Sequence, residues 1–178
     1  MALRKTLVAS AAAVALVAAP AIAVAPAAQA KEVAASGTTL VSFKKEYAGI
    51  FKMIKPVKPA KFIDSRLTFP VTGIDTGVIM HKGGIKLGAL KAMRPNVVIN
   101  EEKKRARVFF DIGGKETQVF WAKHFKVKAD GPKGEVWQGN LHVTKNKAVV
   151  KVLNDSLGVN SITPGLGVGQ IRVTVKTG

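Results

Sequence analysis

The sequence predicts a mostly β protein, an antiparallel β-sandwich of about eight strands with two short helices. Two observations predict the sheets: short segments rich in Val, Ile and Phe recur from residue 67 onward, and glycine-rich or charged turns separate them. A third observation predicts the helices, because two further stretches place apolar residues at helical spacing. Sandwiches and barrels share these signals, and we expect the sandwich.

The predicted strands share β-branched or aromatic residues bounded by turn-forming residues. They cover residues 67–71, 77–81, 85–87, 96–100, 106–112, 118–127, 135–143 and 170–177, and a further strand-like run begins at 38–41. Because side chains alternate between the two faces of a strand, one face of each is expected to meet the core.

The first helix is expected after Ser42, whose hydroxyl can cap it. Its apolar residues, from Phe43 to Phe51, fall on one helical face. Two prolines in the segment 55–61 then end the helix, and we expect this segment to be extended or polyproline-like.

The second helix is expected after Thr144 as its cap, with Gly158 at its C-terminal end. An offset of 102 residues aligns its apolar positions with those of the first helix, although only five of 35 paired residues from 38–72 are identical. Two interpretations stay open: a strand-helix-loop-strand unit repeated at both ends of the domain, or two unrelated short helices.

The N-terminus predicts export. A start with two basic residues, an apolar run over 7–24 and small residues before Lys31 are typical of a secretory signal peptide, residues 1–30. A membrane anchor is the alternative, but prolines interrupt the apolar run. The remainder would be a short polar lead-in, 31–37, and a single β-rich envelope domain, 38–178, free of the membrane.

Charge is the strongest compositional feature. The chain has 28 Lys and Arg against 11 Asp and Glu, a net charge of +17, and +15 remains after removal of residues 1–30. The absence of cysteine excludes a disulfide framework and any cysteine-based metal, haem-attachment or nucleophile chemistry. A basic secreted protein of this kind is expected to contact anionic cell-wall polymers or lipid headgroups.

Two sets of lysines are the candidate contacts for such polyanions. One set recurs every third residue along the extended segment, and the other lies on one side of a predicted strand, beside His124. The six residues are Lys52, Lys55, Lys58, Lys61, Lys126 and Lys128. The alternative is a solvated surface that keeps the protein soluble. No nucleic-acid recognition motif is present, so we expect no specific nucleic-acid partner.

Cofactor and catalytic motifs are scarce. The candidate metal or haem ligands are His81, His124, His142 and the single tyrosine, Tyr47, and no two histidines have a metal-ligand spacing. The sequence lacks a Gly-x-Ser-x-Gly elbow, a His-Glu-x-x-His motif and a phosphate-binding loop. We therefore expect a protein that is not an enzyme and has no resident metal or cofactor, with haem as the one candidate.

Two motifs resemble a known family. Residues 67–73, Leu-Thr-Phe-Pro-Val-Thr-Gly, precede a Gly-x-Ile-x-His-x-Gly-Gly-Ile segment at 77–85, and the tail from 149 carries an apolar Leu-Asn helix, a glycine-rich loop and a last strand. This order resembles secreted actinobacterial proteins that are distantly similar to the haem-transport-associated (HtaA-like) domain family. The resemblance implies an antiparallel β-sandwich and non-enzymatic binding at the cell surface.

The resemblance also implies a haem ligand. In the haem domains a tyrosine soon after a Ser-Phe pair binds iron, and Ser42-Phe43 followed by Tyr47 offers these residue types with one extra position.

The main prediction from the whole sequence is a secreted, envelope-associated polyanion-binding protein. The alternative is a haem-binding module that uses Tyr47 and one of His81 or His124, and the third is a hydrolase of unknown substrate.

Overall fold

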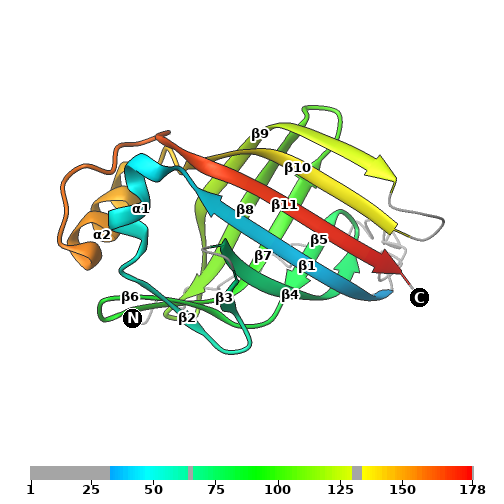
Figure 1. Ribbon diagram of the computed structural model, residues 1–178, viewed down its shortest axis with the longest axis horizontal. Helices are drawn as coiled ribbons and strands as arrows, with labels where there is room; N and C mark the ends of the chain where they lie inside the picture. Colours follow the sequence, from blue (N-terminus) through cyan, green and yellow to red (C-terminus); the bar gives the residue numbers. More distant parts are fainter. Residues whose placement is uncertain (1–32, 64–65, 130–133, 178) are drawn as a thin grey trace, which may run out of the picture.

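The computed structural model describes residues 33–63, 66–129 and 134–177, so the predicted signal peptide lies outside the described residues. The described part is built mainly of β-strands, with two α-helices and one 3₁₀ helix (Figure 1). The strands are β1 (Val33–Phe43), β2 (Ile54–Val57), β3 (Lys61–Ile63), β4 (Arg66–Asp75), β5 (Val78–His81), β6 (Gly84–Leu87), β7 (Leu90–Asn100), β8 (Arg105–Ile112), β9 (Lys115–Ala129), β10 (Gly134–Val143) and β11 (Gly167–Thr177). The helices are η1 (Lys45–Tyr47), α1 (Ala48–Phe51) and α2 (Lys147–Leu157).

The sheet closes into a barrel. Antiparallel pairing runs from β7 through β5, β4, β1, β11, β10 and β9 to β8, and β8 pairs with β7 again. The mostly β class with two short helices is confirmed, whereas the predicted sandwich is wrong. Strands of sandwiches and barrels both bury alternate side chains, so the pattern cannot tell them apart. The pairing of β7 with β8 joins the two ends of this series and removes the edges that a sandwich would keep.

Three short strands extend this barrel beside one end. β6 follows β5 along the same edge of β7, β2 pairs with β6, and β3 pairs with β4. The segment predicted as polyproline-like therefore consists of β2, a turn and β3. Lys55 lies directly opposite Lys86 of β6. β1 also begins at Val33, inside the predicted lead-in 31–37.

The two α-helices lie at one end of the barrel, opposite the C-terminus (Figure 1). α2 buries Val150, Leu153 and Leu157, and its N-cap is Asn146, whose Oδ1 accepts hydrogen bonds from two backbone amides. Thr144, the predicted cap, instead accepts from the Asn146 amide. Ser42, the other predicted cap, belongs to β1, so the first helix is reduced to η1 and the four residues of α1.

The two helical units lie side by side in the barrel. β1 precedes α1 and β4 follows it, and these two strands pair with each other. In the same way β10 precedes α2, β11 follows it, and they pair with each other. The two units are joined because β1 also pairs with β11. The offset of 102 residues equates the pair Val41 and Leu67 with Val143 and Gly169, whereas β10 pairs Leu141 with Gly169. The topology agrees with the repeat hypothesis, and the register differs from it by two residues.

Candidate functional site

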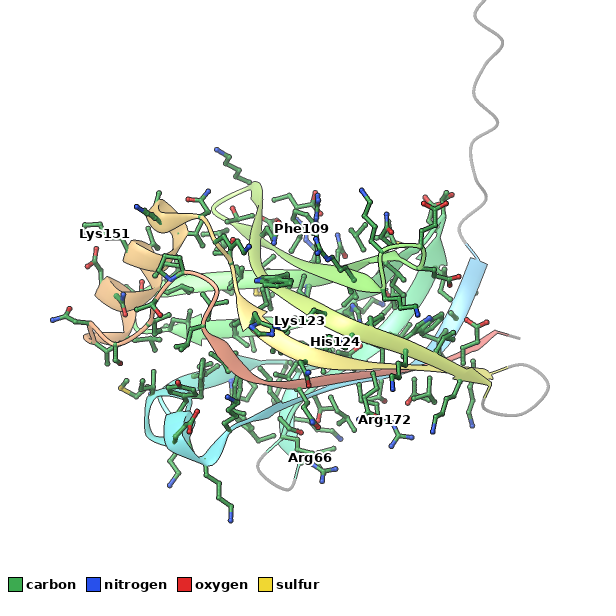
Figure 2. All side chains as sticks on the ribbon, turned by 90° about the horizontal axis from the view of Figure 1, so that it is seen from above. Arg66, Phe109, Lys123, His124, Lys151 and Arg172 are labelled. Carbon is green, nitrogen blue, oxygen red and sulfur yellow. The ribbon has the colours of Figure 1, made fainter. Side chains whose placement is uncertain are left out.

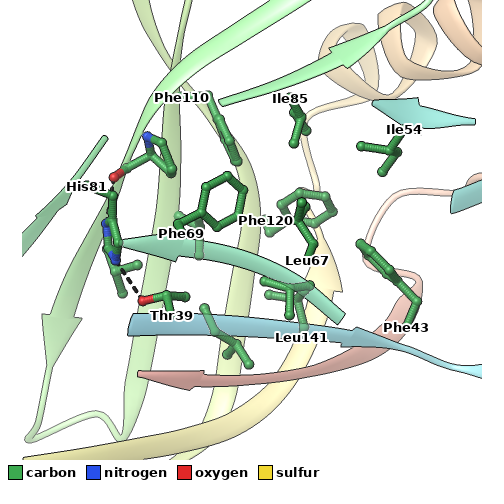
Figure 3. A pocket seen from close by; sticks show the side chains of 15 residues that line it. Thr39, Phe43, Ile54, Leu67, Phe69, His81, Ile85, Phe110, Phe120 and Leu141 are labelled. Carbon is green, nitrogen blue, oxygen red and sulfur yellow. Dashed lines mark hydrogen bonds between the residues drawn. The ribbon is translucent and has the colours of Figure 1, made fainter. Parts of the chain in front are cut away.

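The interior of the barrel is filled with side chains. Phe69, Phe110 and Phe120 pack edge to face, with centroids 6.1 and 6.4 Å apart, and line its wall with Leu67 and Leu141 (Figure 3). The cavity among them measures about 20 Å³. A water molecule needs about 10–15 Å³ by this measure, so the interior has room for one water and for no organic ligand. The candidate ligand sites are therefore the grooves on the outside of the barrel.

His81 points into this core and is only 3% exposed. Its Nδ1 lies 2.7 Å from the Pro95 carbonyl oxygen, and its Nε2 lies 2.6 Å from Oγ1 of Thr39 (Figure 3). Because a carbonyl only accepts, Nδ1–H donates to Pro95 and Nε2 accepts from the Thr39 hydroxyl. Burial lowers the pKa of His81 to about 4, so the ring is neutral at pH 7. Both ring nitrogens of His81, a predicted haem ligand, are therefore occupied by hydrogen bonds inside the core.

An outer groove, which we name the His142 groove, crosses β9, β10, β11 and the end of β1. It has a volume of about 400 Å³, within the usual range for small-molecule sites. Its lining residues are Ser42, Phe43, Lys44, Lys123, Asn140, Leu141, His142, Gly167, Gly169 and Gln170. The groove thus combines two cations, amides and one imidazole, and none of its lining residues is acidic.

His142 is held in this groove by its neighbours on both sides. Its ring stacks on Trp121, with centroids 4.7 Å apart, and its Nδ1 lies 3.1 Å from the Gly165 carbonyl oxygen. Its Nε2 is buried and has no hydrogen-bond partner. Burial lowers the pKa of His142, and the positive charges of Lys123 and Lys44 lower it further. The ring is therefore kept neutral, with an unused lone pair on Nε2.

A second outer groove, the His124 groove, adjoins the first and shares Asn140 and Gln170 with it. It has a volume of about 360 Å³ and brings together three predicted site residues, His124, Lys126 and Lys128. Figure 2 shows Lys123 and His124 close together on β9, with Arg172 on nearby β11. A bulge at His124, which has a positive φ of 53°, places this side chain at the groove.

A third outer groove, the Trp121 groove, lies on the β8 side of Trp121 and measures about 650 Å³. The cations on its wall are Lys103, Arg105, Arg107 and Lys145. The Lys145 ammonium lies 5.6 Å from the Trp121 ring centroid, within range of a cation–π interaction. The residues that line all three grooves include no Asp or Glu.

The other predicted site residues lie elsewhere. The four lysines of the predicted basic segment are exposed but lie in different elements. Lys52 follows α1, Lys55 lies in β2, Lys58 lies in the turn after β2, and Lys61 begins β3. None of them lines an outer groove described above. Tyr47 lies in η1, where it packs half-buried against the hydrophobic core. The structure therefore unites His124 with Lys126 and Lys128, and separates them from Tyr47 and His81.

The sequence analysis named His142 among the candidate metal or haem ligands but left it out of the haem alternative, and it did not single out Trp121. Both occupy outward positions of neighbouring strands and lie directly opposite each other in the β9–β10 pairing. The signal in the sequence was that each of the two residues is flanked by apolar residues, Phe120 and Ala122 or Leu141 and Val143, which the structure buries. Their partnership depends on strand register, which the sequence does not state.

Two further observations concern the described residues as a whole. In the ranges 33–63, 66–129 and 134–177, no three His, Cys, Asp or Glu side chains cluster as ligands of one metal ion. No helix in the same ranges has the length and apolarity needed to cross a membrane.

The fold and the grooves define a class: a closed antiparallel barrel with a filled interior and basic grooves on its outer face. Two solved structures from Corynebacterium glutamicum share this fold. The haem-binding protein HtaB has a TM-score of 0.60 and 13% identity, with 82% of this chain and 95% of HtaB covered. The C-terminal domain of HtaA has a TM-score of 0.56 and 12% identity, with 83% and 99% covered.

The structural similarity confirms the predicted distant resemblance to HtaA-like domains at the level of the fold. No family model matches the chain, and no curated protein matches it in sequence.

Proposed function

We propose that this protein is a non-enzymatic haem-binding module of the cell envelope. The observation that carries the proposal is the barrel that it shares, over nearly the whole described chain, with the haem-binding protein HtaB. This favours the haem alternative of the sequence analysis over polyanion binding as the main function. The predicted signal peptide supports a place at the cell surface.

The His142 groove fits such a ligand. A porphyrin needs apolar contacts for its ring, cations for its carboxylates and a ligand for its iron. Phe43, which is half-buried, supplies apolar surface, Lys44 and Lys123 supply cations, and the buried Nε2 of His142 is unpartnered. Bound haem would supply the iron centre, and the chain's own residues would hold it and shield one face from water.

The ligands predicted from sequence differ in their support. His124 lines the adjoining groove and is exposed. Tyr47 stays a proposal that rests on the family resemblance. His81 would have to break its hydrogen bonds to Thr39 and Pro95 before it could bind iron.

Titration of the mature chain with ferric haem tests the function. We expect a Soret band distinct from that of free haem, saturating at one haem per chain, because the structure offers one groove with an unpartnered imidazole nitrogen. Variants Tyr47→Phe, His81→Gln and His124→Gln test the sequence-based ligands, and loss of the band in one of them would identify that ligand. A spectrum identical to free haem at every ratio would refute the proposal.

Contact with anionic envelope polymers or lipid headgroups is a second candidate function. The acid-free linings of the three grooves favour it. Arg105 also lies directly opposite Lys123 across β8 and β9, and Gln138 lies between Lys126 and Arg172. Like charges directly opposite destabilise a sheet unless counter-charges offset them. A bound polyanion would provide those counter-charges.

Retention on purified cell wall tests the second function. It should fall steeply as salt rises, because exposed charges are screened within about 10 Å at 0.1 M salt. The double variant Lys126→Gln and Lys128→Gln should elute at lower salt than a control that removes Lys86 and Lys91 from β6 and β7. The pair Lys55→Gln and Lys58→Gln tests the predicted lysine segment in the same way. Elution indifferent to salt would exclude this function.

A further inference from the structure

The unpartnered nitrogen of His142 identifies a ligand site that lies apart from Tyr47, His81 and His124. We propose that Nε2 of His142 is the atom that binds the haem iron in this chain. The inference rests on the proposed haem-binding function, and it names the residue through which that function works. Buried polar nitrogens are almost always hydrogen-bonded, so an unpartnered one in a groove requires an explanation.

The hydrogen bond at the other ring nitrogen prepares Nε2 for this role. The Gly165 carbonyl can only accept, so the proton lies on Nδ1 and the lone pair on Nε2. Metal-binding histidines commonly have this arrangement, in which a backbone carbonyl fixes the ring orientation and the tautomer. The stack on Trp121 holds the ring plane from the side. The imidazole is thus oriented before any ligand arrives.

The space beside the ring depends on Gly167. This residue lies directly opposite His142 in the β10–β11 pairing. A Cβ on Gly167 would stand 3.2 Å from Cε1 of His142, tighter than nearly all real contacts of a Cβ atom. The same Cβ would stand 3.3 Å from Nδ1, so the missing side chain leaves room at the edge of the ring formed by Cε1 and Nδ1. Its φ does not require glycine, which makes alanine a clean probe of that space.

Lys44 is the movable neighbour at the same position. Its ammonium lies 4.0 Å from where the Gly167 Cβ would stand, and it pairs with Glu46 at 3.4 Å. Both side chains of this pair are more than half exposed, at 53% and 59%, so the pair holds Lys44 only weakly. The Lys44 side chain is therefore free to move, and its charge can meet a carboxylate of the same ligand.

The three alternatives lack one or more of these features. His81 has both nitrogens engaged in hydrogen bonds, and the His124 side chain is exposed. Tyr47 packs against the core at η1, outside the lining of the His142 groove. Within the described residues, His142 is the histidine that combines a fixed tautomer with an unpartnered nitrogen in a groove.

The test uses the mature chain, ferric haem, and absorption and electron paramagnetic resonance spectra that distinguish imidazole from phenolate ligation. Wild type should show the imidazole signature. His142→Ala should bind haem at least about tenfold more weakly, since even supporting residues of a metal ligand change affinity by about 10–100-fold. Added imidazole should restore the wild-type spectrum in His142→Ala. Lys91→Ala, a control at an exposed position of β7 outside the three grooves, should leave affinity and spectrum unchanged.

Gly167→Ala is the second variant, because it leaves the imidazole in place and obstructs the space beside it. Weaker binding in Gly167→Ala supports the inference even if His142→Ala does not fold. Wild-type affinity and spectrum in both variants would overturn the assignment and leave the haem function standing. A phenolate signature in wild type would overturn it in favour of Tyr47. No haem binding by wild type would overturn the assignment and the proposed function together.

Discussion

Acidification should destabilise this protein through His81. The folded barrel holds this ring neutral among Thr39, Pro95 and Phe69, and burial lowers its pKa from 6.5 to about 4. The unfolded chain, whose histidine keeps the ordinary value, therefore binds more protons between these two pH values. The stabilisation is complete above pH 6.5 and is lost as the pH falls toward 4.

The size of the effect follows from the two pKa values. Between pH 7 and pH 5, protonation of the unfolded state lowers the free energy of unfolding by about 2 kcal/mol, and the full shift amounts to about 3 kcal/mol. Small domains have a total stability of about 5–15 kcal/mol, so this loss is measurable by urea denaturation. His142 adds a loss of the same sign, because its pKa is also lowered.

The variant His81→Gln isolates the contribution of His81. Glutamine keeps one donor and one acceptor for Pro95 and Thr39 but does not titrate. Urea unfolding at pH 7 and pH 5 should show a difference about 2 kcal/mol smaller in His81→Gln than in wild type. NMR titration of the His81 ring gives a direct check. An ordinary pKa, or an unchanged pH dependence in His81→Gln, would refute the reasoning.

Three other changes test the barrel through urea unfolding. Ile171→Ala, at a 1% exposed core position, should lower the unfolding free energy by about 2–5 kcal/mol, and the exposed Val152→Ala should change it little. Asn146→Ala should lose about 1 kcal/mol by removing the cap of α2, and an unchanged midpoint would contradict that role. Gly37→Ala would place a Cβ 2.0 Å from the Thr174 carbonyl oxygen and should destabilise strongly, whereas Gly49→Ala meets no atom within 4 Å and should be tolerated.

Local signals predicted the strands and could not predict how they close. Each strand expected after residue 67 overlaps an observed one, because alternation and turn residues act over a few positions. The closing pair, β7 with β8, looks like any other hairpin in the sequence. The first helix failed for a related reason. Phe43 and Phe51 were expected on one face of a single helix. Phe43 instead belongs to β1 and Phe51 to α1, and their rings stack with centroids 3.8 Å apart. Their apolar spacing therefore reflects a contact between two elements.

Alternation also explains which parts of the site were predictable. Alternation along one strand predicted that His124, Lys126 and Lys128 share a surface, and all three line the His124 groove from β9. His142, Lys44 and Gly167 come from β10, the end of β1 and β11, so their meeting depends on register across three strands. The His-x-Gly-Gly motif drew attention to His81, yet β5 turns that side chain into the core.

The two proposed functions meet at Lys123. It lines the His142 groove, it lies opposite Arg105 of the Trp121 groove, and Asn140 separates it from Gln170 at the centre of the basic face. A haem carboxylate bound by Lys123 would relieve its repulsion with Arg105, as a phosphate of a wall polymer would. The two ligands would then compete for one cation. Haem binding measured with added polyanion should weaken in wild type and become insensitive to the polymer in Lys123→Gln, whereas an equal response of both proteins would place the two ligands on separate surfaces.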